Sequence, residues 1–248
     1  QPRRPAMDDQ AHMPGPGPAT GTAAASRPPL DGGLRLALAT CTLIAAVPLM
    51  GRALGPGHAA MMVCLAFLPW GWLLARRPAL DLHTARRLGL TLAGLTGLWL
   101  ACHQPLLSDD LYRYLWDGKL LRHGLDPYAY PPDAPGLAAL RDAHWQAINH
   151  RDIATIYPPL AQLLFALADG LLHHPAAMQL LALLGHLVGV LLVARLCQPR
   201  DGLPCLLLAI NPLALTESAQ SGHIDSLVGA SILATMLALR RGAWRWAA

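Results

Sequence analysis

Five long stretches without a charged residue constrain the fold of this chain more than any other feature. They are rich in leucine, show no two-residue alternation, and cover residues 36–51, 53–75, 88–108, 170–194 and 202–216. An α-helix of about 20 apolar residues crosses the hydrocarbon core of a bilayer. Charged residues make up about 25% of an ordinary soluble domain but 14% of this chain. The sequence therefore predicts an all-α, polytopic transmembrane helical bundle.

The basic residues indicate how the bundle is oriented. All but one of the 19 are arginines, and they lie beside the apolar runs rather than in one patch, which argues against nucleic-acid binding. The expected spans are Leu34–Leu54, Ala59–Ala75, Leu88–Cys102, Ala176–Ala194, Leu203–Thr216 and Ile224–Leu239. The connection after the second span is flanked by Arg76, Arg77, Arg86 and Arg87, so the positive-inside rule places it and the N-terminus in the cytoplasm.

A long loop, residues 103–157, then falls on the outer side. The segment Leu160–Leu172 is short for a span and contains Asp169, so we predict a re-entrant or interfacial helix that returns to the outer face. This arrangement returns the later arginines to the cytoplasmic side: Arg195, Arg200, Arg240 and Arg241. Residues 1–33, rich in Pro and Gly, are predicted to be a disordered cytoplasmic tail. Residues 34–248 would form a transmembrane domain, which we expect to be incomplete at its C-terminus.

An adjacent pair of carboxylates, Asp109 and Asp110, opens the outer loop directly after the third span. Ionisable residues at a membrane boundary are costly and indicate a functional site. One carboxylate can accept a proton from an attacking hydroxyl group, while the other orients that hydroxyl or binds a metal. A helix N-cap at Ser108–Asp109 is an alternative interpretation, and it is compatible with the first.

The same loop contains all five tyrosines of the chain. A long, aromatic and acidic loop beside a membrane is usually a binding or catalytic surface rather than a simple connection between helices. Aromatic rings stack on sugars and carboxylates accept hydrogen bonds from sugar hydroxyls. The candidate substrate-binding residues are therefore Tyr112, Trp116, Asp117, Asp126, Tyr128 and Tyr157. For the tyrosines, an interfacial aromatic belt is the alternative.

Three cations are candidates for contact with a phosphate: Arg113, Arg122 and His223. A guanidinium group suits this role because it binds phosphate through two parallel hydrogen bonds. For Arg113 the alternative is a local salt bridge with Asp117, four residues along the same predicted helix.

A third polar segment, NPLALTESAQSGHID, covers residues 211–225. Pro212 should break the expected span that contains it. Beyond the break come Glu217, which is the only glutamate of the chain, and then His223 and Asp225. Ionisable side chains at the mouth of a broken helix are typical of a substrate site.

Three segments together resemble the GT-C superfamily of membrane glycosyltransferases: SDDLYRYLWDGKLLRHGLDPYAYPP, INHRDIATIYPPLAQLLFAL and NPLALTESAQSGHIDS. The resemblance is to bacterial members of the glycosyltransferase family 87 or mannosyltransferase type. More distantly, the chain is similar to the glycosylphosphatidylinositol mannosyltransferase that adds the first mannose. The resemblance covers roughly residues 100–240. Two features depart from the family, because relatives carry the acidic loop after the first span rather than the third and have more spans than expected here.

The resemblance implies a GT-C-like bundle whose long outer loop contains short interfacial helices. It also implies transfer of a hexose, in particular mannose, from a polyprenyl-phosphate donor to a lipid or glycan acceptor, with inversion at the anomeric carbon. The family's acidic base corresponds to Asp109 or Asp110. Its tyrosine-diproline segment begins at Tyr157, and its glycine-histidine-aspartate element contains His223 and Asp225. No cofactor is certain, although a divalent cation is possible, and membrane lipids surround the chain.

The implied location is the inner, or plasma, membrane of a bacterium, with the active site on the outer, periplasmic side. The alternative function is a transporter or flippase subunit for a glycolipid, since polar groups in broken helices also suit transport. The absence of an internal repeat and the placement of the charges in a loop favour the transferase. A non-catalytic scaffold would leave the carboxylate pair and Glu217 unexplained.

Overall fold

The structure, a computed structural model, describes residues 30–243, and within this range the chain is helical and contains no strand. The expected all-α fold is therefore confirmed. The helices are α1 (Leu30–Ala45), α2 (Val47–Leu54), α3 (Pro56–Arg76), α4 (Leu82–Ala101), α5 (Asp110–Arg122), α6 (Pro159–Leu171), α7 (Pro175–Ala194), α8 (Leu203–Ala209), α9 (Pro212–Ala219) and α10 (Asp225–Arg240), with the short 3-10 helices η1 (Pro135–Leu140) and η2 (Trp145–Ala147). Most of the expected tail lies outside the described residues, but α1 already begins at Leu30 rather than after residue 33.

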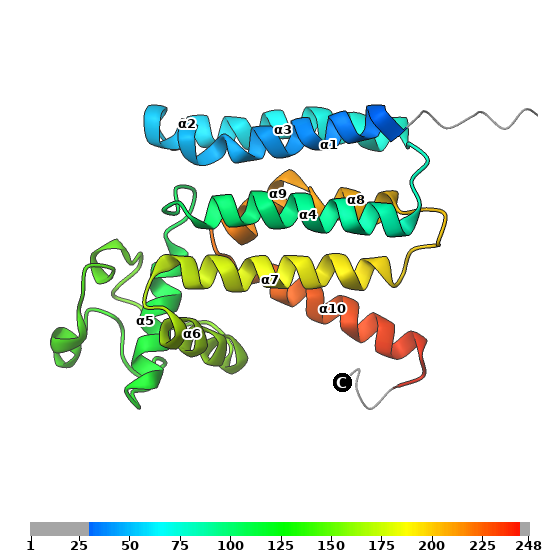
Figure 1. Ribbon diagram of the computed structural model, residues 1–248. Helices are drawn as coiled ribbons and strands as arrows, with labels where there is room; N and C mark the ends of the chain where they lie inside the picture. The colour runs from blue at the N-terminus through cyan, green and yellow to red at the C-terminus, as the bar shows by residue number, and fades with distance from the viewer. Residues whose placement is uncertain (1–29, 244–248) are drawn as a thin grey trace, which may run out of the picture.

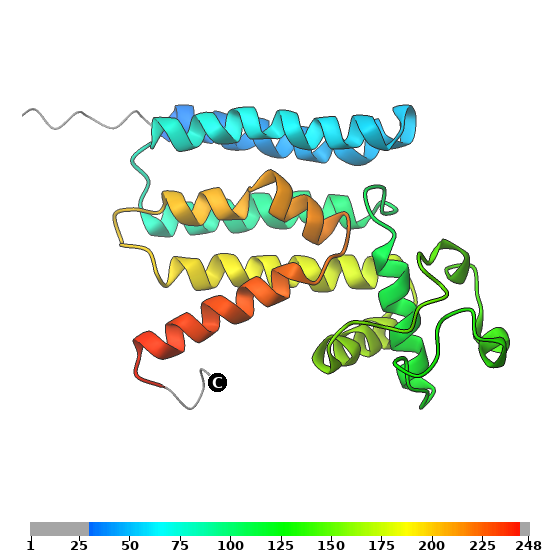
Figure 2. The same cartoon turned by 180° about the vertical axis from the view of Figure 1, so that it is seen from behind.

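The long helices stack in three layers (Figure 1). Helices α1 to α3 form the first layer, α4 with α8 and α9 the second, and α7 with α10 the third. The view from behind shows that α10 crosses α7 obliquely (Figure 2). The main core lies between the layers and includes Leu73, Leu100, Leu183, Leu206 and Leu215, all fully or almost fully buried.

Among the described residues, three helical stretches are long and apolar enough to cross a membrane: Asp31–Leu54, which joins α1 and α2, Pro56–Arg76 and Pro175–Ala194. The other three expected spans lie alongside them in the stack. One of these is broken at Pro212, as predicted. The side chain of Asn211 accepts a hydrogen bond from the backbone N–H of Ala214 at 2.9 Å, so α9 starts afresh there with its own cap.

One end of the stack, which we call the arginine end, gathers the arginines on which the predicted orientation rests: Arg76, Arg77, Arg86, Arg87, Arg195, Arg200, Arg240 and Arg241. It comprises the end of α3, the start of α4, the α7–α8 connection and the end of α10 (Figure 1). Two backbone hydrogen bonds tie its connections together, from Leu82 to Pro199 at 3.0 Å and from Gly202 to Leu80 at 2.8 Å. The predicted grouping of the arginines is thus confirmed, although the side of the membrane does not follow from it.

The opposite end, which we call the loop end, contains α5, α6, the segment from residue 123 to 158 and the α9–α10 turn (Figure 1). Helix α6 packs closely on α5 at Gly118, where the absence of a side chain lets the two backbones approach. A Cβ at this position would lie 2.3 Å from the carbonyl oxygen of Phe165. Helix α6 therefore stays at the loop end and α7 starts from there, so Leu160–Leu172 does not cross the bundle, as predicted.

Candidate active site at the loop end

The first turn of α5 presents the predicted carboxylate pair. Asp109 occupies the N-cap position, yet its side chain makes no capping hydrogen bond. Instead, the amide nitrogen of Asn149 donates to Asp109 Oδ1 at 2.8 Å and to Asp110 Oδ1 at 2.6 Å. Asp109 is exposed and Asp110 is partly buried. Both carboxylates therefore point away from the helix N–H groups and toward the space beside the loop.

The α9–α10 turn delivers His223 to the same place. Gly222 adopts a positive φ of 72°, which only glycine reaches without strain, and this reverses the chain after α9. Two buried glutamines hold the turn. Gln179 Nε2 donates to the carbonyl oxygen of Gln220 at 2.9 Å, and Gln220 Nε2 donates to that of Gln104 at 3.0 Å. The turn is thereby fixed against the start of the outer loop.

His223 connects the two halves of the site. Its Nδ1 lies 2.6 Å from Glu217 Oε2, and its Nε2 lies 2.9 Å from Ser108 Oγ and 3.6 Å from Asp110 Oδ2. The hydrogen bond with Glu217 raises the pKa of His223, and the nearby Asp110 adds to this, while burial opposes it. The raised pKa favours the charged form of the imidazole. The site thus brings His223 together with Glu217 and Asp110, and Asn149 links Asp110 to Asp109.

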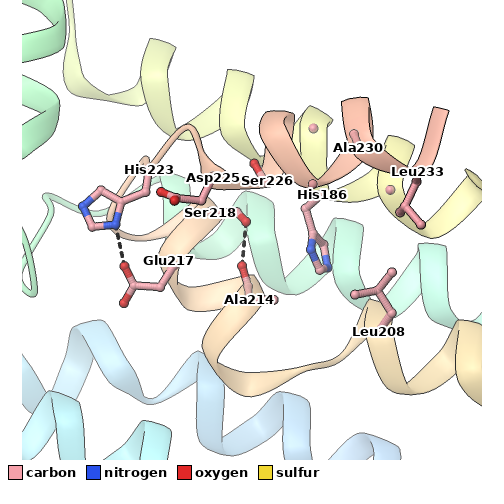
Figure 3. A pocket seen from close by; sticks show the side chains of 13 residues that line it. His186, Leu208, Ala214, Glu217, Ser218, His223, Asp225, Ser226, Ala230 and Leu233 are labelled. Carbon is pink, nitrogen blue, oxygen red and sulfur yellow. Dashed lines mark hydrogen bonds and ion pairs between the residues drawn. The ribbon is translucent and has the colours of Figure 1, made fainter. Parts of the chain in front are cut away.

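A cavity of about 250 Å³ adjoins this cluster between α7, α9 and α10 (Figure 3). Its lining changes in character along the bundle. Glu217, His223 and Asp225 line it at the loop end, whereas Leu208 and Leu233 line it further toward the arginine end. Gly189 of α7 and Gly229 of α10 leave the space open, because a Cβ at either position would meet no atom within 4 Å. The cavity is therefore charged at one end and mostly apolar at the other, where His186 is the polar side chain and bonds to the carbonyl oxygen of Ala209.

A second charged network lies on the other side of α5. Lys119 Nζ contacts Asp142 Oδ2 at 2.8 Å, and His173 Nε2 contacts the same oxygen at 2.9 Å. His173 Nδ1 also bonds to Asp169, which pairs with Arg122 at 2.7 Å. Burial alone would raise the pKa of Asp142, but hydrogen bonds from Lys119 and His173 lower it to about 2. The network joins the loop to α5, to α6 and to the connection between α6 and α7, and it engages Arg122.

Three predicted site residues face the protein interior instead of open space. Arg113 Nε donates to Asp117 Oδ1 at 2.8 Å, and both side chains are buried, so the salt-bridge alternative holds for Arg113 in this structure. Trp116 is 3% exposed and packs among Leu137 and Ile148 of the loop. The reason is that the loop folds over this face of α5, which the helical pattern alone does not reveal.

The remaining aromatic candidates form two groups. Tyr112 stacks on His144 with the ring centroids 5.8 Å apart, and both rings lie beside Lys119, Asp142 and His173 of the second network. Tyr128 Oη donates to the carbonyl oxygen of Tyr157 at 2.6 Å, and its own N–H donates to Asp126 Oδ1 at 2.8 Å. Asp126 and Tyr128 line a separate depression of about 400 Å³ between α5 and α6. The structure therefore does not join these two to the His223 cluster.

Within residues 30–243, no three His, Cys, Asp or Glu side chains converge as a metal site. Sequence reasoning missed two members of the site, Ser108 and Asn149. Both are neutral, so neither shows the energetic cost that makes a charged residue stand out beside a membrane. Their only signal is proximity to the carboxylates, which for Asn149 exists only in the folded chain.

Comparison with known families matches residues 31–248 to the family described as "Alpha-(1->6)-mannopyranosyltransferase, N-terminal domain". The protein named Alpha-(1->6)-mannopyranosyltransferase A of Corynebacterium glutamicum is 27% identical over 209 residues, which make up 77% of this chain and 42% of that relative. The chain thus spans less than half the length of this relative. No solved structure matches it. Because the family match covers nearly the whole sequence, the chain belongs to the alpha-(1->6)-mannopyranosyltransferase family, in the region described as its N-terminal domain.

Proposed function

We propose that this chain carries the acidic centre of a membrane mannosyltransferase that takes mannose from a polyprenyl phosphate. The observation that carries the proposal is the convergence of Asp109, Asp110 and His223 at the loop end, with Asp110 and His223 3.6 Å apart. The family name supports mannosyl transfer to form an α-(1→6) linkage. The acceptor is a lipid or glycan hydroxyl group, and the reaction takes place on the outer side of the membrane.

The chemistry needs one base and a stabilised leaving group. The acceptor hydroxyl oxygen forms a bond to the anomeric carbon, and Asp109 removes its proton. The bond from that carbon to the phosphate oxygen breaks, and the phosphate keeps the electron pair. Attack opposite the leaving group inverts the anomeric carbon. We assign the base to Asp109 because its carboxylate is exposed, whereas Asp110 is held between Asn149 and His223.

His223 is the cation that we assign to the leaving phosphate. It is the one of the three that lies next to the carboxylate pair and lines the cavity, whereas Arg113 is buried in its pair with Asp117 and Arg122 pairs with Asp169 in the second network. Glu217 holds Nδ1 of the protonated imidazole, and the Nε2–H that contacts Ser108 Oγ would be donated to the phosphate instead as negative charge develops on it. A divalent cation shared by Asp109 and Asp110 would serve the same purpose, and addition of a chelator to the transfer assay tests for it.

The cavity beside His223 suits the first isoprene units of the donor. A polyprenyl phosphate has a charged head on an apolar chain, and the cavity lining follows the same order from Glu217 and Asp225 to Leu208 and Leu233. Burial of apolar chain there would contribute to donor binding at about 0.8 kcal/mol per CH₂ group.

The test is mannosyl transfer from labelled polyprenyl-phosphate mannose by membranes that contain the full-length protein. Asp109→Asn and Asp110→Asn should each lower the rate by about 100-fold or more, the usual contribution of a positioned base or its partner. Asp152→Asn is the matched control, because Asp152 is an exposed carboxylate of the same loop with no side-chain partner among the described residues. Wild-type rates from both variants would overturn the proposal. Movement of the intact labelled lipid across liposomes would instead favour the transporter.

A further inference from the structure

We propose that Asn149 is a positioning residue that sets the geometry of the carboxylate pair. The inference rests on the proposed function, since it concerns how Asp109 and Asp110 are held for catalysis. The amide nitrogen of Asn149 lies 2.8 Å from one carboxylate and 2.6 Å from the other. An amide NH₂ group has two hydrogens, so it can donate to both at once.

Two adjacent carboxylates repel each other, and each pair of negative charges a few ångströms apart tends to separate or to share a proton. Without a bridge, the side chains of Asp109 and Asp110 would turn apart to reduce this repulsion. The Asn149 amide offsets the repulsion by placing a donor between the two groups. It thereby keeps both carboxylates on the same side of α5, facing the space next to His223.

The loop holds Asn149 firmly from both sides. The preceding residue, Ile148, is 5% exposed and packs against Trp116 and Leu120 of α5. The following residue, His150, adopts a positive φ of 45°, which is unfavourable for a residue with a side chain. Its carbonyl oxygen accepts from Arg113 Nη1 at 3.4 Å. An unfavourable backbone conformation persists only where the surroundings enforce it.

Arg113 supports the backbone beside Asn149, a role that differs from the two predicted for it, phosphate binding and a local salt bridge. Asp117 fixes its guanidinium group at 2.8 Å, and that group then contacts the backbone beside Asn149. Helix α5 thus carries Asp110 at its start and, one turn later, a buried ion pair that supports the bridging residue. The bridge and the carboxylates are anchored to the same helix, so they move as one unit.

The test compares variants of the full-length protein in membranes, with labelled polyprenyl-phosphate mannose as the donor. Asn149→Ala removes both donors and should lower kcat by about 10- to 100-fold, as misplacement of a catalytic group does. KM for the donor should stay within about 2-fold, because Asn149 does not line the cavity. Asn149→Gln keeps the amide and should recover part of kcat, whereas Asn149→Asp should not. Gln146→Ala, an exposed amide of the same loop, is the control and should behave as wild type.

Combined variants separate positioning from a merely structural role. In a protein that carries both Asp109→Asn and Asp110→Asn, adding Asn149→Ala should cause little further loss of residual activity, since both groups that Asn149 positions are already gone. A full further loss, or no rescue by Asn149→Gln, would overturn the inference. Wild-type kcat in Asn149→Ala would also overturn it, while the loss in Asp109→Asn and Asp110→Asn would leave the proposed function standing.

Discussion

At the scale of single residues, the protonation of His223 should make stability depend on pH. Its pKa is raised above the ordinary value of 6.5 by Glu217. The stabilisation is therefore complete below that ordinary value and is lost as pH rises through the raised pKa of the folded protein. His223→Gln should lower the Tm of the purified protein by roughly 2–4 °C at pH 6, and the difference from wild type should narrow toward pH 9.

The control for this measurement is His83→Gln, because His83 is exposed at the arginine end and its ring has no hydrogen-bond partner among the described residues. It should change Tm little at either pH. A difference between His223→Gln and wild type that stays constant from pH 6 to pH 9 would contradict the assignment of a charged His223.

Residues of the site differ in how far the sequence could predict them. Asp110, Glu217 and His223 stand out in the sequence because ionisable groups are rare among apolar runs, and the structure brings them together. Asn149 does not stand out, because a neutral amide is common in a polar loop and no local sequence pattern marks it as part of a site. Trp116 shows the opposite error: an aromatic residue in an acidic loop suggests a sugar platform, but its burial depends on how the loop folds back.

At the scale of elements, the cavity between α7, α9 and α10 should control donor affinity. A Cβ at Gly229 would meet no atom within 4 Å, so a larger side chain can grow into the cavity without a clash at its base. Gly229→Leu should raise KM for the donor about tenfold, the effect of losing about two buried CH₂ groups. The kcat value should be largely retained, since the carboxylate pair is untouched.

Gly94→Leu is the matched control, because Gly94 lies in α4, also has open space at its Cβ, and does not line the cavity. Steady-state rates over a range of donor concentrations distinguish the two variants. An unchanged KM for the donor in Gly229→Leu would contradict the hypothesis that the isoprenoid chain binds in this cavity.

The elements themselves were largely predictable where backbone chemistry dictates them. Pro212 lacks an N–H group for a helical hydrogen bond, and α8 and α9 separate there, with Asn211 as the cap of α9. The short length of Leu160–Leu172 and its Asp169 favoured a re-entrant or interfacial helix over a span, and α6 stays at one end of the bundle. The 3-10 helices η1 and η2 were not predicted, because they are set by packing of the loop on α5 rather than by a local periodic pattern.

At the scale of the whole molecule, the connections with the orienting arginines lie at one end of the bundle, and the carboxylate pair and the long loop lie at the other. The sequence predicted this division because one short helix, α6, restores the order of all later connections. The structure reproduces it without reference to a membrane. The assignment of the arginine end to the cytoplasm rests on the positive-inside rule alone. A direct measurement of the orientation can test it.

Cysteine labelling on intact cells measures this orientation. In a variant that lacks the five native cysteines, Asp133→Cys places one thiol on the exposed loop, and Arg87→Cys places one at the start of α4. A membrane-impermeant maleimide should modify position 133 directly and position 87 only after permeabilisation. The reverse result would put the carboxylate pair in the cytoplasm, where soluble sugar donors are available. The reason to invoke a lipid-linked donor would then disappear, even if Asp109 and Asp110 proved essential.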